Sequence, residues 1–85
     1  MHRATPQFWR LYDELPEDVR RLANRSFSLL KKNPRHSSLH FKKLGRHWSV
    51  RVGRAHRALA VPDGADLTWV WIGRQADYDE LLKRR

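Results

Sequence analysis

Two arginines in the middle of the chain, Arg51 and Arg57, can hold a phosphate group between them. A guanidinium group stays protonated in proteins and offers several N–H donors to phosphate oxygens. A turn of three residues, Arg54 to His56, places both arginines on one sheet face, whereas a turn of two places them on opposite faces. We favour three, because this register gathers small and β-branched residues on the core face, although Leu59 then faces outward. The residues gathered are Val50, Val52, Ala58 and Ala60.

Cleavage of RNA by its own 2′-hydroxyl needs a base near that oxygen, cations around the phosphorane and an acid for the leaving oxygen. The two arginines can supply the cations. The candidates for proton transfer are His56, His40 and the lysines Lys42 and Lys43. The alternative, that both arginines are solvated residues of a hairpin, stays open. Tyr78, on the last predicted helix, can likewise serve packing or chemistry.

Acidic residues are absent between Val19 and Pro62, although the chain contains 9 Asp and Glu residues. This acid-free span holds 12 of the 18 lysines and arginines, and the formal net charge of the chain is +9. A field of one sign costs stability through self-repulsion and is usually retained when a polyanion or an acidic protein neutralises it. We therefore expect such a partner, the alternative being a soluble protein from an Arg-rich proteome.

Several classes of site are excluded by what the sequence lacks. There is no cysteine, and the histidines are spread over separate predicted strands and loops, so neither a metal nor a cofactor is expected. Dinucleotide-binding, Walker A, zinc-protease and nucleophile-elbow motifs are missing. The start of the chain lacks a secretory signal, and the longest apolar run, Leu67 to Ile72, is too short to span a bilayer. We expect a cytoplasmic protein without a membrane segment.

The elements that position these residues begin with two helices. With 85 residues, the chain is expected to form a single domain, 1–85. Thr5 can cap a helix from Pro6 to Glu14, and Leu15-Pro16 breaks it. A second helix starts at Pro16, with acidic residues favourably placed at its positive end, and Asn33-Pro34 stops it. The spacing predicts an antiparallel helical hairpin.

Four strands and a closing helix follow. The period-two patterns predict strands over Leu39–Leu44, Trp48–Val52, Arg57–Val61 and Leu67–Ile72, and a short helix over Gln75–Leu82. The last strand is apolar on both sides, Leu67/Trp69/Trp71 and Thr68/Val70/Ile72, which is typical of an interior strand. The predicted class is α+β: an N-terminal helical hairpin packed on a four-stranded antiparallel sheet, with a short C-terminal helix.

Several local strings, in this order, resemble a known family. They are Phe8-Trp9-x-x-Tyr12-x-x-Leu15-Pro16, Asn33-Pro34-x-His36-x-Ser38-Leu39-His40-Phe41-Lys42-Lys43-Leu44, Trp48-Ser49-Val50-Arg51-Val52-Gly53 with Arg57-Ala58-Leu59, and Trp69-Val70-Trp71-Ile72-Gly73 with Tyr78-Asp79. Together they cover nearly the whole chain and resemble the RelE/ParE superfamily of toxins from type II toxin–antitoxin systems. The resemblance implies a microbial RNase-like fold and inhibition by a cognate antitoxin.

The resemblance also implies a site. RelE-like toxins use basic residues on two core strands, a residue after the last strand and an aromatic residue on the closing helix. These positions fall on Ser49 and Arg51, Arg57, Gln75 and Tyr78. Ser49 is not basic and Gln75 cannot donate a proton, although neighbouring Arg74 can substitute. The family's N-terminal strand is either missing or reduced to a few residues before Thr5.

Our leading hypothesis is a toxin that acts as a metal-independent endoribonuclease on mRNA, in association with the ribosome, and is neutralised by an antitoxin. The catalytic candidates are Arg51, Arg57, His56, Gln75 and Tyr78, and the RNA-binding candidates are His40, Lys42, Lys43, Arg46, Arg54 and Arg74. A ParE-like inhibitor of DNA gyrase and a non-catalytic nucleic-acid-binding module are the alternatives.

Overall fold

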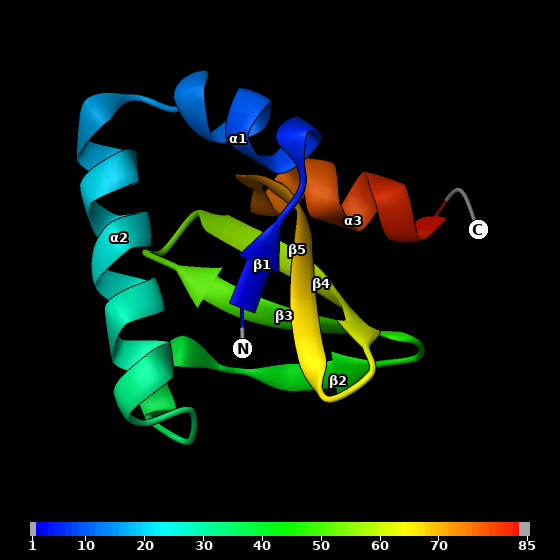
Figure 1. Ribbon diagram of the computed structural model, residues 1–85. Helices are drawn as coiled ribbons and strands as arrows, with labels where there is room; N and C mark the ends of the chain where they lie inside the picture. The colour runs from blue at the N-terminus through cyan, green and yellow to red at the C-terminus, as the bar shows by residue number, and fades with distance from the viewer. Residues whose placement is uncertain (1, 84–85) are drawn as a thin grey trace.

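A computed structural model describes residues 2–83 of the chain, apart from the side chain of Leu82. The elements in chain order are β1 (His2–Ala4), α1 (Pro6–Asp13), α2 (Glu17–Lys32), the 3-10 helix η1 (Ser37–Leu39), β2 (Lys42–Leu44), β3 (His47–Val52), β4 (His56–Asp63), β5 (Asp66–Arg74) and α3 (Gln75–Lys83). Figure 1 shows the two N-terminal helices beside the sheet, with α3 at the end of the chain. The predicted α+β class is confirmed.

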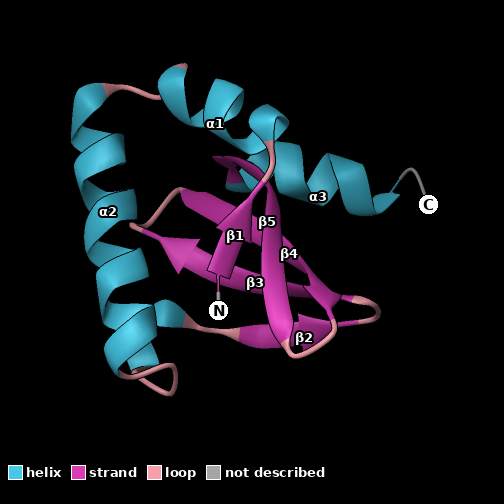
Figure 2. Cartoon of the chain, viewed as in Figure 1, coloured by secondary structure: helices cyan, strands magenta, loops and turns pink. Residues whose placement is uncertain are grey.

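The sheet has five strands in the order β1-β5-β4-β3-β2, one more than predicted. Strands β2 to β5 form the expected antiparallel meander. β1 pairs in parallel with β5 and makes β5 an interior strand, as Figure 2 shows. A strand of three residues is too short to produce an alternating pattern, so the sequence indicated it only through the reduced first strand that the family resemblance allows.

Both N-terminal helices begin and end near the predicted residues, for the predicted reasons. The Thr5 hydroxyl accepts a hydrogen bond from the Phe8 amide at 3.1 Å and caps α1. Arg20 donates from Nη1 to the Asp13 carbonyl at 3.3 Å and to the Leu15 carbonyl at 2.5 Å, which ties the start of α2 to the last residue of α1 and to the connection between the helices. α1 and α2 bury their apolar sides against one sheet face. The core comprises Phe8, Leu15, Val19, Ala23, Leu30, Leu39, Val50, Val52, Ala58, Ala60, Trp69 and Ile72.

The predicted first strand, Leu39–Leu44, is wrong in its first half. Leu39 ends a 3-10 helix, and His40 adopts a left-handed conformation with φ 44°, so β2 begins only at Lys42. The His36 side chain accepts a hydrogen bond from the Ser38 amide at 3.2 Å and thereby caps this 3-10 helix. The local side-chain cap competes with extended backbone, which the alternation of apolar residues does not reveal.

The hairpin between β3 and β4 has the predicted number of turn residues in a different register. The turn consists of Gly53 to Ala55, so Val52 pairs with His56 and Arg51 pairs with Arg57. Gly53 has φ 65°, a backbone conformation that glycine adopts most readily. The expected core face is unchanged, because a shift of this pairing by two residues preserves the side-chain direction.

A β-bulge in β5 separates two tryptophans that were expected on one face. Leu59 pairs with Trp71 and Ala60 pairs with Trp69, which leaves Val70 as the extra residue. One extra residue reverses the alternation, so Trp69 enters the core and Trp71 lies on the opposite face. The predicted grouping of Leu67, Trp69 and Trp71 is therefore wrong, and the opposite face gains an aromatic residue.

Candidate functional site

Arg51 and Arg57 lie directly opposite each other on β3 and β4. Both therefore project from the sheet face opposite α1 and α2, as predicted. Side chains directly opposite in an antiparallel pair are neighbours, and like charges there are destabilising. No carboxylate of the described residues forms an ion pair with either arginine. The pair is thus a concentration of positive charge without an acidic partner in the described chain.

Hydrogen bonds fix the guanidinium of Arg57 from two sides. Its Nη1 donates to the hydroxyl of Ser49 at 3.1 Å, and its Nε donates to the side-chain oxygen of Gln75. Ser49 is fully buried. The guanidinium also lies 5.7 Å from the centre of the Tyr78 ring, within cation–π range. The structure therefore brings Ser49, Gln75 and Tyr78 together around Arg57.

Gln75 occupies the junction between β5 and α3. Its backbone amide donates to the Ala55 carbonyl in the β3–β4 turn at 2.6 Å, and this bond holds the start of α3 against the turn. Its side-chain nitrogen donates to Asp79 at 3.0 Å, one helical turn further on. The Gln75 amide thus bridges the Arg57 cation and a carboxylate.

Tyr78 packs α3 onto the face that carries the arginines. It is 3% exposed, and its ring lies 6.4 Å from the Trp71 ring and 6.4 Å from the His47 ring. The Tyr78 hydroxyl is buried and makes no hydrogen bond within the described residues. Trp71 lies closely over Gly73, where an added Cβ would come within 2.7 Å of the indole. The open face predicted from the sequence is therefore partly covered by α3.

Sequence reasoning assigned no role at this face to His47 and Trp71. His47 lies two residues before Ser49 on β3, so the alternation of the strand was a signal for its face. Trp71 reaches the face only because of the bulge, for which the sequence carries no signal.

The predicted RNA-binding residues are spread along the sheet. Lys42 pairs with Ser49 and points to the same face as the arginines, whereas Lys43 pairs with Trp48 and points to the other. Arg54 is exposed in the turn next to the arginine pair. Arg46 lies in the turn at the opposite end of β3, and exposed His40 precedes β2. Arg74 forms an ion pair with Asp77 at 3.2 Å.

His56 does not join the arginine pair. It directly precedes Arg57 on β4 and points to the other face, where it lines a groove with Leu11 and Leu15. Burial and the nearby charge of Arg74 lower the pKa of His56 from its ordinary value of 6.5. The structure thus places His56 away from the arginine pair, and proton transfer by His56 stays a prediction.

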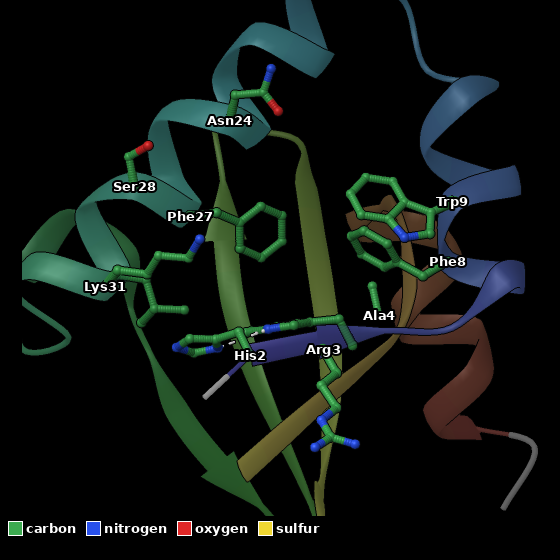
Figure 3. A pocket seen from close by; sticks show the side chains of 11 residues that line it. His2, Arg3, Ala4, Phe8, Trp9, Asn24, Phe27, Ser28 and Lys31 are labelled. Carbon is green, nitrogen blue, oxygen red and sulfur yellow. Dashed lines mark hydrogen bonds between the residues drawn. The ribbon is translucent and has the colours of Figure 1, made fainter.

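A separate, largely apolar groove of about 380 Å³ opens between β1, α1 and α2. Figure 3 shows Trp9 and Phe8 from α1 and Phe27 from α2 around it, with Lys31 at its edge. Trp9 is 52% exposed, an unusual exposure for so large an apolar side chain. Across its floor, His2 Nδ1 accepts a hydrogen bond from Trp69 Nε1 at 3.0 Å.

The fold matches solved structures of toxins from toxin–antitoxin systems. The RelB–RelE antitoxin–toxin complex from Methanococcus jannaschii aligns with TM-score 0.72 at 12% identity, over 93% of this chain and 96% of that one. YafQ from E. coli aligns with TM-score 0.73 at 14% identity, over 92% and 96%. The YoeB/ParE toxin from Agrobacterium tumefaciens aligns with TM-score 0.68 at 17% identity, over 87% and 96%. The chain therefore shares the fold of these solved structures.

A scan of protein-family models finds no match to this sequence, and a search of curated proteins finds none either. None of the described helices is long and apolar enough to cross a membrane.

Proposed function

We propose that this protein is the toxin of a type II toxin–antitoxin system and a metal-independent endoribonuclease that cleaves mRNA on the ribosome. The observation that carries the proposal is the pair Arg51 and Arg57, which lie directly opposite each other on adjacent strands. Neither arginine forms an ion pair with a carboxylate of the described residues. Such a pair costs stability in the free protein and is suited to an anion. The resemblance of the sequence to RelE-like toxins makes an RNA phosphodiester the expected anion.

The chemical contribution of this face is the stabilisation of negative charge. Arg57 is held in place before the substrate arrives, so little reorganisation is needed as charge develops on the phosphorane. Lys42, in register with Ser49, and exposed Arg54 extend the positive surface along the RNA backbone. The 2′-hydroxyl of the RNA itself supplies the attacking oxygen in this proposal, so no metal-bound water is required as the nucleophile.

A cognate antitoxin is the second partner that we propose. Complexes of RelE with RelB are among the structures that share this fold. The acid-free span offers an antitoxin a positive surface, and the groove at Trp9 offers it an apolar one beside Lys31. An acidic segment with apolar side chains fits both. Its binding would neutralise the cations that RNA needs.

Inhibition of DNA gyrase is the second candidate function. Gln75 engages both Arg57 and Asp79 and cannot act as a general acid, which suits a binding surface as well as an active site. The name of one similar structure combines YoeB and ParE. The cellular damage distinguishes the two functions: fragmented mRNA with intact chromosomes supports cleavage, whereas DNA breaks with intact mRNA support gyrase inhibition.

The test compares Arg57→Ala with Arg21→Ala after induction in cells. Arg21 is an exposed arginine on α2 that forms an ion pair with Glu17 at 2.9 Å. Because both variants replace an arginine by alanine, they change the net charge equally. We expect Arg57→Ala to lose about 2–4 kcal/mol of transition-state stabilisation, the scale of one lost charge-stabilising donor. Primer extension on mRNA measures cleavage. Equal cleavage by both variants would contradict the assignment of Arg57.

A further inference from the structure

The orientation of the Gln75 amide is determined by the groups on its two sides. The oxygen faces Arg57 Nε, and the nitrogen faces the Asp79 carboxylate at 3.0 Å. A flipped amide would turn N–H donors toward a guanidinium, which has only donors, and an oxygen toward a carboxylate. Both hydrogen bonds would be lost. Asp79 therefore selects the amide orientation that Arg57 requires.

Asp79 influences Arg57 without neutralising it. The two side chains form no ion pair, because the Gln75 amide lies between them. Gln75 and Ser49 engage the Nε and Nη1 donors of Arg57. A guanidinium has five N–H donors, so three remain available to an anion.

We infer that Asp79 is a positioning residue, whose carboxylate orients the Gln75 amide and so holds the guanidinium of Arg57 ready for phosphate. The identity of the anion rests on the proposed function, whereas the positioning itself rests on the hydrogen bonds alone. Asp79 lies on the exposed surface of α3, so its substitution leaves the core intact.

Three variants separate positioning from a general effect of charge. Asp79→Asn removes the charge but keeps an oxygen that can accept from Gln75, and Asp79→Ala removes both. Glu80→Gln is the matched control, because it removes one negative charge from the neighbouring exposed position on α3. If Asp79 acted only through its charge, all three variants would strengthen phosphate binding.

The measurement is NMR of the Arg57 Nε–H group, assigned with Arg57→Lys, during titration with inorganic phosphate. We expect Asp79→Ala to bind phosphate about three- to tenfold more weakly than Asp79→Asn, the scale of one lost hydrogen bond. Exchange of the Nε–H proton with water should accelerate in Asp79→Ala and stay near that of the wild type in Asp79→Asn and Glu80→Gln. Equal affinities and equal exchange in the two Asp79 variants would overturn the inference.

The exchange rates decide the inference even if the proposed function fails. If wild-type protein binds no phosphate and cuts no RNA, the proposed nuclease loses its support. Faster Nε–H exchange in Asp79→Ala alone would still establish the positioning role, and unchanged exchange would still refute it.

Discussion

Removal of the Arg57 side chain should destabilise the fold as well as remove the proposed anion site. Arg57→Ala leaves the fully buried Ser49 hydroxyl without its donor, which costs about 1–3 kcal/mol. Loss of the contact with the Tyr78 ring adds about 0.5–1 kcal/mol. Relief of the repulsion from Arg51, opposite on β3, returns about 0.2–1 kcal/mol. The free energy of unfolding should therefore fall by about 0.5–4 kcal/mol, with about 2 kcal/mol as the central value.

A double-mutant cycle with Ser49→Ala isolates the hydrogen bond. Ser49→Ala removes the same bond from the other side, so the two substitutions should not add. We expect a coupling of about 0.5–1.5 kcal/mol, measured by urea unfolding of the wild type, both single variants and the double variant. Additivity to within about 0.3 kcal/mol would refute the contact between Arg57 and Ser49 and the pre-organised site with it.

Four other predictions test separate parts of the structure. Gly53→Ala should lower the free energy of unfolding by about 1–2 kcal/mol, because φ is 65° and the new Cβ would lie 2.8 Å from the Leu22 side chain. Thermal unfolding measures the loss. Gly64→Ala is the control for backbone strain alone, because Gly64 has φ 63° and no atom near its added Cβ. His2 accepts a hydrogen bond from Trp69, and burial lowers its pKa from 6.5. As the pH drops below about 6.5 the unfolded chain therefore binds the proton before the folded protein does, and the free energy of unfolding falls. Urea unfolding at several pH values should show a smaller fall in His2→Gln. Antitoxin affinity should fall steeply as salt rises, and a partner that binds equally at low and high salt would contradict an electrostatic interface. Gln75→His should raise RNA cleavage where proton transfer to the leaving group limits the rate, because imidazole titrates near the working pH, although the variant also loses the Gln75 oxygen that holds Arg57. A folded, antitoxin-binding variant with no gain would mean that position 75 does not act on the leaving group.

The sequence predicted the fold well where one local signal dominated. Acidic residues Glu17 and Asp18 at one end and Asn33-Pro34 at the other correctly bounded α2. Strict alternation over Trp48–Val52 correctly assigned the side of β3 that faces the hydrophobic core. Signals of this kind depend on residues close in sequence, so they can be interpreted without knowledge of the tertiary structure.

The errors arose where one residue of slip decides the outcome. Leu67–Ile72 is apolar throughout, so alternation could not reveal that Val70 is a bulge and that Trp71 changes face. A turn over Arg54 to His56 and a turn over Gly53 to Ala55 give the same core face. The structure has the second turn, so His56 is a strand residue on the face opposite the arginines. Candidate site residues on a strand are therefore only as reliable as the register that orients them.

Gln75 shows that a residue type can exclude one role and conceal another. An amide cannot protonate a leaving group, so the sequence argues against acid catalysis at this position. The structure shows the same amide holding Arg57 on one side and Asp79 on the other. Because Arg57 keeps its charge and Asp79 stays one amide away, the face concentrates positive charge in a fixed geometry. In the RNA cleavage that we propose, such a face would lower the barrier by stabilising charge on the phosphorane. Proton transfer would then come from other groups, or cleavage would depend on how the ribosome places the RNA.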